Sequence, residues 1–103
     1  ALPAWVEFTW QQPQTLGVLR IVSGWRDGRA PRPVDPVRSC VLQVPTPTGW
    51  KEVPGTRIAD NTDFEIWRRF DPIQTDRVRL LITESPSDTA RLWEVHFYAP
   101  QTR

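Results

Sequence analysis

The sequence is poor in the residues that build redox sites, metal cages and membrane spans. Its 103 residues include a single cysteine, Cys40, and a single histidine, His96. One cysteine excludes an internal disulfide, and with it the disulfide-stapled scaffolds found among small secreted domains. Metal-ligand spacing of His and Cys and a Gly-rich phosphate loop are both absent. No apolar run approaches the roughly 18 residues of a membrane span, and no signal peptide is visible.

The chain also lacks an excess of charge of either sign. The formal net charge is +1, so overall charge does not predict a nucleic-acid or membrane partner. Hydrophobic residues make up 39%, below the usual share, but six Trp and four Phe bury enough area for a small core. Eleven Pro suit the turns and edges of an all-β protein better than helices. The length indicates one domain, residues 1–103.

Residues 75–98 carry the clearest strand pattern. Alternate positions are apolar in two runs, first at Val78, Leu80 and Ile82 and then at Trp93, Val95 and Phe97. Alternation at a period of two indicates strands with one buried face. The polar segment 84–89 between the runs, ESPSDT, is typical of a loop. We therefore predict two antiparallel strands joined by this loop.

The rest of the chain predicts more strands and no amphipathic helix. Strands are expected at 5–10, 16–23, 39–44, 50–53 and 64–70, with short turns at 11–15, 45–49 and 71–75. Longer irregular segments are expected at 24–38, 54–63 and 84–90. If successive strands alternate in direction, the three long loops share one end of a sandwich. Because binding sites are commonly built on loops held by a rigid scaffold, we predict the site at that end.

Catalytic groups are weakly indicated. Cys40 lies in an apolar run and is expected to be a small buried hydrophobe, and His96 lies mid-strand, so we do not predict a Cys–His nucleophile pair. Pairs of loop carboxylates suit glycoside hydrolysis, and the acids at the long-loop end are Asp27, Asp35, Asp60, Asp63 and Glu84. Acids are common in turns, so we predict a non-catalytic domain and keep hydrolysis as a further alternative.

The loop SGWRDG presents the strongest binding pattern. A Trp25 ring face suits the apolar face of a pyranose, and Arg26 and Asp27 can hydrogen-bond its hydroxyls. The other two loops add the remaining predicted ligand residues, Asn61, Asp63 and Glu84. Trp25 capping the core is an equal alternative. The other Trp residues fall within strands and are expected to pack; Trp67 is the exception, because apolar residues already occupy the other face of its strand.

The order of several loose motifs resembles the discoidin-like, or coagulation factor 5/8 type C (F5/8 type C), domains. The matching pieces run in family order over nearly the whole chain: WVEFTWQQPQTLGVLRI, GWKEVPG, FDPIQTDRVRLLIT and ARLWEVHFY. The resemblance implies the galactose-binding-like jelly roll, an all-β antiparallel β-sandwich. Bacterial members include carbohydrate-binding modules attached to secreted glycosidases. Arg26 matches a position that often contacts the sugar in these relatives.

Two departures from the family pattern bear on the prediction. The family has a further segment before the equivalent of Trp5, and this chain starts at Ala1. We therefore expect that the complete protein carries more residues, or that another chain completes the sheet. Glu94 matches a late-strand Glu that supplies a calcium ligand in many relatives, but its usual co-ligands lie in that first segment. The resemblance thus implies Glu94 as a metal ligand and calcium as a structural cofactor.

The sequence as a whole predicts a non-catalytic carbohydrate-binding module of a larger bacterial enzyme, such as a glycoside hydrolase. The resemblance implies a secreted, extracellular or periplasmic location and a carbohydrate ligand. We predict neither nucleic acid nor membrane as partner, because the net charge is near zero and the long loops offer few aliphatic side chains to a lipid. A protein-interaction module of the discoidin type is the main alternative, because loops rich in Trp, Arg and Pro also suit a protein interface.

Overall fold

The computed structural model describes residues 2–24, 36–86 and 92–100. Its strands are β1 (Ala4–Ser23), β2 (Ser39–Thr46), β3 (Gly49–Glu52), β4 (Glu65–Glu84) and β5 (Leu92–Tyr98). They form one antiparallel sheet in the order β3-β2-β4-β1-β5. The described part of the chain contains no helix with the length and apolar character needed to cross a membrane.

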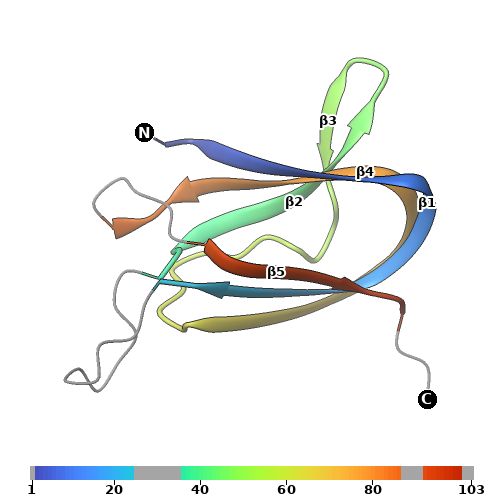
Figure 1. Ribbon diagram of the computed structural model, residues 1–103. Coiled ribbons are helices and arrows are strands. Elements are labelled where there is room, and N and C mark those ends of the chain that lie inside the picture. The colour runs from blue at the N-terminus through green and yellow to red at the C-terminus, as the bar shows by residue number, and fades with distance from the viewer. Residues whose placement is uncertain (1, 25–35, 87–91, 101–103) are drawn as a thin grey trace.

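Two 20-residue strands, β1 and β4, give the sheet its shape. They pair with each other along most of their length, and both curve around the same edge of the molecule (Figure 1). The register between them shifts from Thr9 to Gln14, and Gln14 pairs with Thr75. Pro13 and Pro72 lie in these bends, where a residue without a backbone N–H is tolerated. The sheet therefore folds over onto itself into two layers.

The first layer holds β3, β2, the second half of β4 and the first half of β1. The second layer holds the other halves of β4 and β1, and β5. The buried core lies between the layers and consists of Leu16, Leu19, Ile21, Val37, Cys40, Leu42, Val53, Ile58, Ile66, Phe70, Val78, Leu80 and Ile82. This arrangement confirms the predicted all-β antiparallel sandwich, and it confirms the buried face of Val78, Leu80 and Ile82.

Three details differ from the prediction. Residues 11–15 and 71–75 were expected as turns, but they lie inside β1 and β4. The strands expected to pair across the 84–89 loop, now β4 and β5, are separated by β1. At the polar residues that interrupt the alternation, each long strand thus bends and continues from one layer into the other. The predicted turn at 45–49 is confirmed, because β2 ends and β3 begins there and the two pair.

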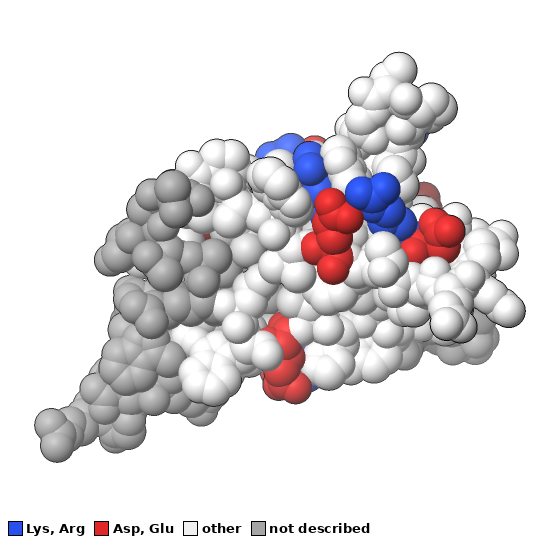
Figure 2. All heavy atoms as spheres, turned by 45° about the horizontal axis from the view of Figure 1, so that its top comes forward, with Lys and Arg blue, Asp and Glu red and all other residues white. Residues whose placement is uncertain are grey.

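The outer face of the first layer carries Arg side chains over Trp rings. The guanidinium carbons of Arg77 and Arg79 lie 5.0 and 4.4 Å from the Trp50 ring centroid, and Arg79 also lies 5.3 Å from the Trp5 centroid. Arg77 Nη2 forms an ion pair with Glu7 Oε2 at 3.0 Å. Figure 2, which brings this side forward, accordingly shows basic and acidic side chains beside one another. Positive and negative charges are therefore mixed on this face, and neither sign dominates its electrostatic potential.

Candidate functional site

The flanks of the long irregular segments meet at one end of the sandwich. Ser23 N donates to Phe64 O at 2.9 Å, Arg38 N donates to Glu84 O at 3.0 Å, and Asn61 N donates to Arg38 O at 2.9 Å. These backbone bonds join the residue before the 24–38 segment and the last residue of that segment to the end of the 54–63 segment, to Phe64 just after it, and to the start of the 84–90 segment. The loops predicted to share one end are thus tied together there.

Asn61 braces this end through its side chain. Its Nδ2 donates to Val37 O at 2.8 Å and to Asp63 O at 2.9 Å, and its Oδ1 accepts from Asp63 N at 3.1 Å. Both amide hydrogens are therefore used within the protein, and only Oδ1 keeps a free lone pair. Beneath it, the buried Ser23 Oγ accepts from Val37 N at 3.0 Å. The primary role of Asn61 in this geometry is to hold the loop flanks.

Trp93 is the large exposed ring at this end. The residue is 64% exposed, although the alternation of its strand predicts a buried position. Its indole Nε1–H donates to the carbonyl of Gly24, which fixes the ring beside the start of the 25–35 segment. An exposed indole in a fixed orientation offers a flat apolar surface to a ligand.

A β-bulge explains why Trp93 leaves the core. Val95 and Phe97, two and four residues later, pack against the buried cluster as predicted. The register between β1 and β5 shifts just before them, which leaves Trp93 unpaired as the extra residue of the bulge; the flanking pairs are Val22 with Glu94 and Ser23 with Leu92. Bulges re-aim side chains and are common beside functional sites. The interpretation of Trp93 as a buried packing residue is therefore wrong.

Exposed carboxylates accompany the ring. Asp63 and Glu84 are both exposed and are linked through the backbone of Arg38 and the Asn61 brace. Glu84 Oε1 accepts from Ser39 Oγ at 2.9 Å, which orients the carboxylate and leaves its other oxygen available. Carboxylate oxygens accept hydrogen bonds from hydroxyl and ammonium groups. The exposed ring and these exposed carboxylates therefore lie at the same end of the sandwich.

The structure places half of the predicted ligand residues at this end. Asn61, Asp63 and Glu84 lie there, whereas Trp25, Arg26 and Asp27 fall outside the described residues. Asp27 and Asp35, two of the acids considered for hydrolysis, also fall outside them. Trp93 was missed because alternation was extended to the first residues of the strand. Its position beside a loop, where the core face runs out of partners, is the signal that points to it.

Glu94 lies on the outer side of β5. Its Oε1 is 3.1 Å from His96 Nε2, and no group of three or more metal-binding side chains occurs among residues 2–24, 36–86 and 92–100. The described residues by themselves therefore do not form a calcium site around Glu94. The calcium prediction stays a prediction, and no step below depends on it.

Cys40 has the environment of a core residue. It is 2% exposed, and burial raises the pKa of its thiol to about 12, an effect that the positive charge of Arg68 partly opposes. A thiol with such a pKa is not a nucleophile at neutral pH. The prediction that Cys40 is a buried hydrophobe is confirmed.

The comparisons with known proteins rest on fold alone. No family model matches the sequence, and no curated protein matches it. Among solved structures, SpGH29 matches 98% of this chain with a TM-score of 0.71 and 19% identity, and this chain spans only 20% of that protein.

Chitosan-binding module 1, derived from a chitosanase/glucanase of Paenibacillus sp. IK-5, has a similar fold. The crystal structure of a selenomethionine-labelled variant gives a TM-score of 0.72 at 18% identity, covering 96% of this chain and 70% of the module. The solution structure gives 0.65 at 22% identity, covering 96% and 72%. Identities this low establish a shared fold, and the membership in the discoidin-like family stays a prediction.

Proposed function

We propose that this chain is a non-catalytic carbohydrate-binding module of a larger secreted bacterial enzyme. The observation that carries the proposal is the exposed Trp93 ring, fixed by its N–H at the end where the loop flanks converge. Two supporting facts are the fold shared with modules named for chitosan binding and the small share of SpGH29 that this fold occupies. An extracellular or periplasmic location and membership in the discoidin-like group belong to the same proposal.

The proposed binding mode is stacking with peripheral hydrogen bonds. A pyranose lies with its apolar face on Trp93, and its hydroxyl or amino groups donate to Asp63 and Glu84. We propose Trp25, Arg26 and Asp27, which follow Gly24 in the sequence, as further ligand residues. A single ring and a few exposed hydrogen bonds support an affinity near millimolar, or about 4 kcal/mol.

Calorimetric titration tests the proposal. Chitosan oligomers, chitin oligomers and neutral galactose and glucose oligomers form the ligand set, starting with chitosan because of the named neighbours. We expect Trp93→Ala to weaken binding by about tenfold or more, equivalent to roughly 1.4 kcal/mol. Trp93→Phe loses the hydrogen bond to Gly24 but keeps a stacking ring. We therefore expect this variant to retain most of the affinity.

Trp5→Ala is the matched control, because Trp5 is 54% exposed and its ring lies beside Arg79 on the outer face of the first layer. It should bind as the unaltered protein does. Unchanged binding in Trp93→Ala, or no binding to any oligomer in the set, would overturn the proposal.

A protein-interaction module is the second candidate function. Trp5 and Trp67 are each more than half exposed on other faces of the sandwich, and exposed Trp is enriched at protein interfaces. A stoichiometric protein complex that persists in Trp93→Ala and is lost in Trp5→Ala, with every sugar inert, would favour this function over the first.

A further inference from the structure

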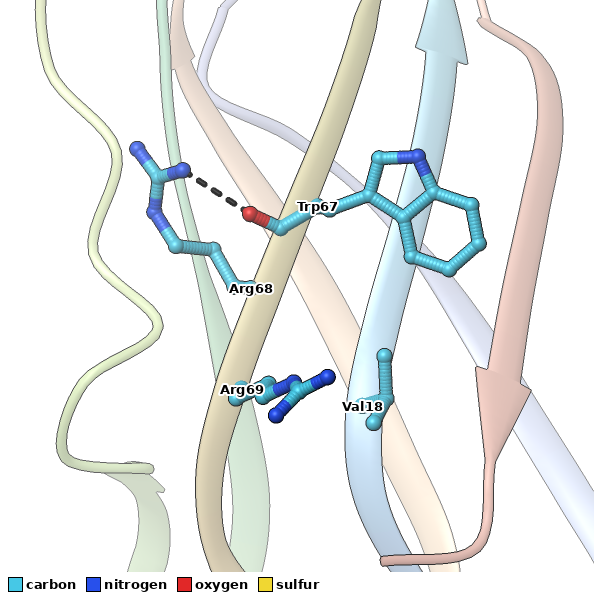
Figure 3. Close-up of a pocket in the computed structure, with 4 residues that line it drawn as sticks. All are labelled: Val18, Trp67, Arg68 and Arg69. Atoms are coloured by element: carbon cyan, nitrogen blue, oxygen red, sulfur yellow. Dashed lines mark hydrogen bonds between the residues drawn. The ribbon is translucent and has the colours of Figure 1, made fainter. Parts of the chain in front are cut away.

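A hollow lies on the outer side of the second layer, away from the loop flanks. It is lined by Val18 of β1 and by Trp67, Arg68 and Arg69 of β4, and it has a volume of about 480 Å³. Small-molecule sites fall in the range of roughly 300–1,000 Å³. Figure 3 shows Trp67 reaching from β4 over β1, with Arg69 pointing toward Val18 beneath it. The hollow thus combines an apolar floor, an aromatic side and cationic groups.

The Trp67 ring is both exposed and positioned. The residue is 51% exposed, and its ring stacks on Tyr98 with centroids 5.7 Å apart and planes 17° apart. Arg20 lies 5.5 Å from the Trp67 centroid and is itself held by an ion pair with Glu65. Three strands therefore fix one exposed ring, which needs little ordering when a ligand binds.

The Arg69 guanidinium of the hollow is available to an anion. Arg69 forms no ion pair with any residue that the structure describes, and Arg68 Nη1 donates only to the neighbouring Trp67 carbonyl at 3.0 Å. Glu65 is engaged by Arg20, and Glu94 contacts His96. Arg69 is thus left without an ion-pair partner among the described residues.

We propose that this hollow is a second ligand site, specific for an acidic sugar unit such as a uronate. The apolar face of the pyranose packs on Trp67, and its planar carboxylate accepts paired hydrogen bonds from the Arg69 fork, which points toward Val18 beneath the ring. The buried Val18, 3% exposed, forms the floor. The site is separate from the Trp93 site and does not depend on it.

Single-stranded nucleic acid also uses aromatic rings and cations, but the rest of the surface argues against it. Such ligands need a basic groove that follows the phosphate backbone. The net charge here is only +1, and Arg20, the cation over the Trp67 ring, is already paired with Glu65. The single Arg69 guanidinium at the hollow fits one carboxylate-bearing unit better than a polyanion.

The test is calorimetric titration of the whole chain at low ionic strength with trigalacturonate, with a neutral galactose trisaccharide and a sulfated galactose trisaccharide alongside. We expect the uronate to bind near millimolar and at least about tenfold more tightly than the neutral sugar. Trp67→Ala and Arg69→Gln should each weaken uronate binding by about tenfold or more, and Arg69→Lys should show an intermediate loss, because it keeps the charge without the fork.

Two variants serve as controls. Lys51→Gln removes one positive charge from exposed β3 and should leave uronate binding unchanged, as should Trp93→Ala, which reports on the other site. Thermal melting checks that Trp67→Ala and Arg69→Gln are folded. Equal binding of neutral and acidic sugars, tighter binding of the sulfated sugar or of a short oligonucleotide, or full binding in both Trp67→Ala and Arg69→Gln would each overturn the proposal.

Discussion

Cys40 shows how burial controls the chemistry of a single side chain. Desolvation raises its pKa from 9.0 to about 12, so the folded state holds the neutral thiol. A raised pKa contributes stability that is complete below the unfolded value of 9.0 and is lost as the pH rises through about 12. We expect no reaction of the native protein with a thiol reagent at pH 8, and rapid reaction in denaturant, measured by absorbance. Native labelling as fast as that of the denatured chain would contradict the burial of Cys40.

The Trp residues show what the sequence can and cannot say at this scale. Trp10 packs edge-on against Phe97 with centroids 5.7 Å apart, as a packing residue should. Trp67 was singled out because its strand already has a buried face, and it is half exposed. Trp93 could not be recognised in the same way, because a bulge depends on how β5 meets β1 and leaves no mark on the alternation itself.

At the scale of the element, Gly17 marks a second irregularity of β1. The register against β4 shifts between Leu16 and Val18, and Pro100 crosses beside the glycine. A Cβ added at Gly17 would lie 2.7 Å from Pro100 Cα and 3.0 Å from Pro100 Cβ, which is too close. Gly is thus required here for close approach of two backbone segments.

We therefore expect Gly17→Ala to destabilise the protein by about 1–3 kcal/mol through overpacking, measured by denaturant unfolding. In a chain shortened to end at Ala99 the clash is absent, so the same substitution should be neutral or stabilising by up to roughly 1 kcal/mol. An equal loss of stability in both chains would show that Pro100 is not the cause.

The bends of β1 and β4 explain why two segments predicted as turns lie inside strands. The segments 11–15 and 71–75 each contain Pro and polar residues, which interrupt the alternation as a turn does. Whether such a break reverses the chain or only bends it depends on the partner strand. Because both breaks occur opposite one another, with Gln14 paired to Thr75, the two strands bend together and keep their hydrogen bonds.

At the scale of the whole molecule, the two layers share β1 and β4 and enclose one core. Leu19 in the second layer is 1% exposed and Leu80 in the first is 0% exposed. We expect Leu19→Ala and Leu80→Ala each to cost about 2–5 kcal/mol and to shift a single unfolding transition seen alike by circular dichroism and Trp fluorescence. Val6→Ala, at a 38% exposed position, should change stability by less than about 0.5 kcal/mol.

Separate transitions for the two probes in either Leu variant would mean that the layers unfold independently. That result would contradict a single core built on two continuous strands.

The sequence by itself determined the strand content, the buried face of Val78, Leu80 and Ile82, and the burial of Cys40. These follow from the two-residue period of a strand and from the turn chemistry of Pro and polar residues, which are local properties. It also singled out Asp63 and Glu84, because acids in loop segments can be read directly.

Tertiary structure alone decided which strands are neighbours and where the rings lie. Strand pairing is long-range, so only the folded sheet shows that β1 separates β4 from β5. The same pairing produces the bulge that exposes Trp93, turns Asn61 into a brace between loop flanks, and brings Trp67, Arg69 and Val18 around one hollow. Each of these depends on residues far apart in the chain meeting at a fixed register, which local sequence does not specify.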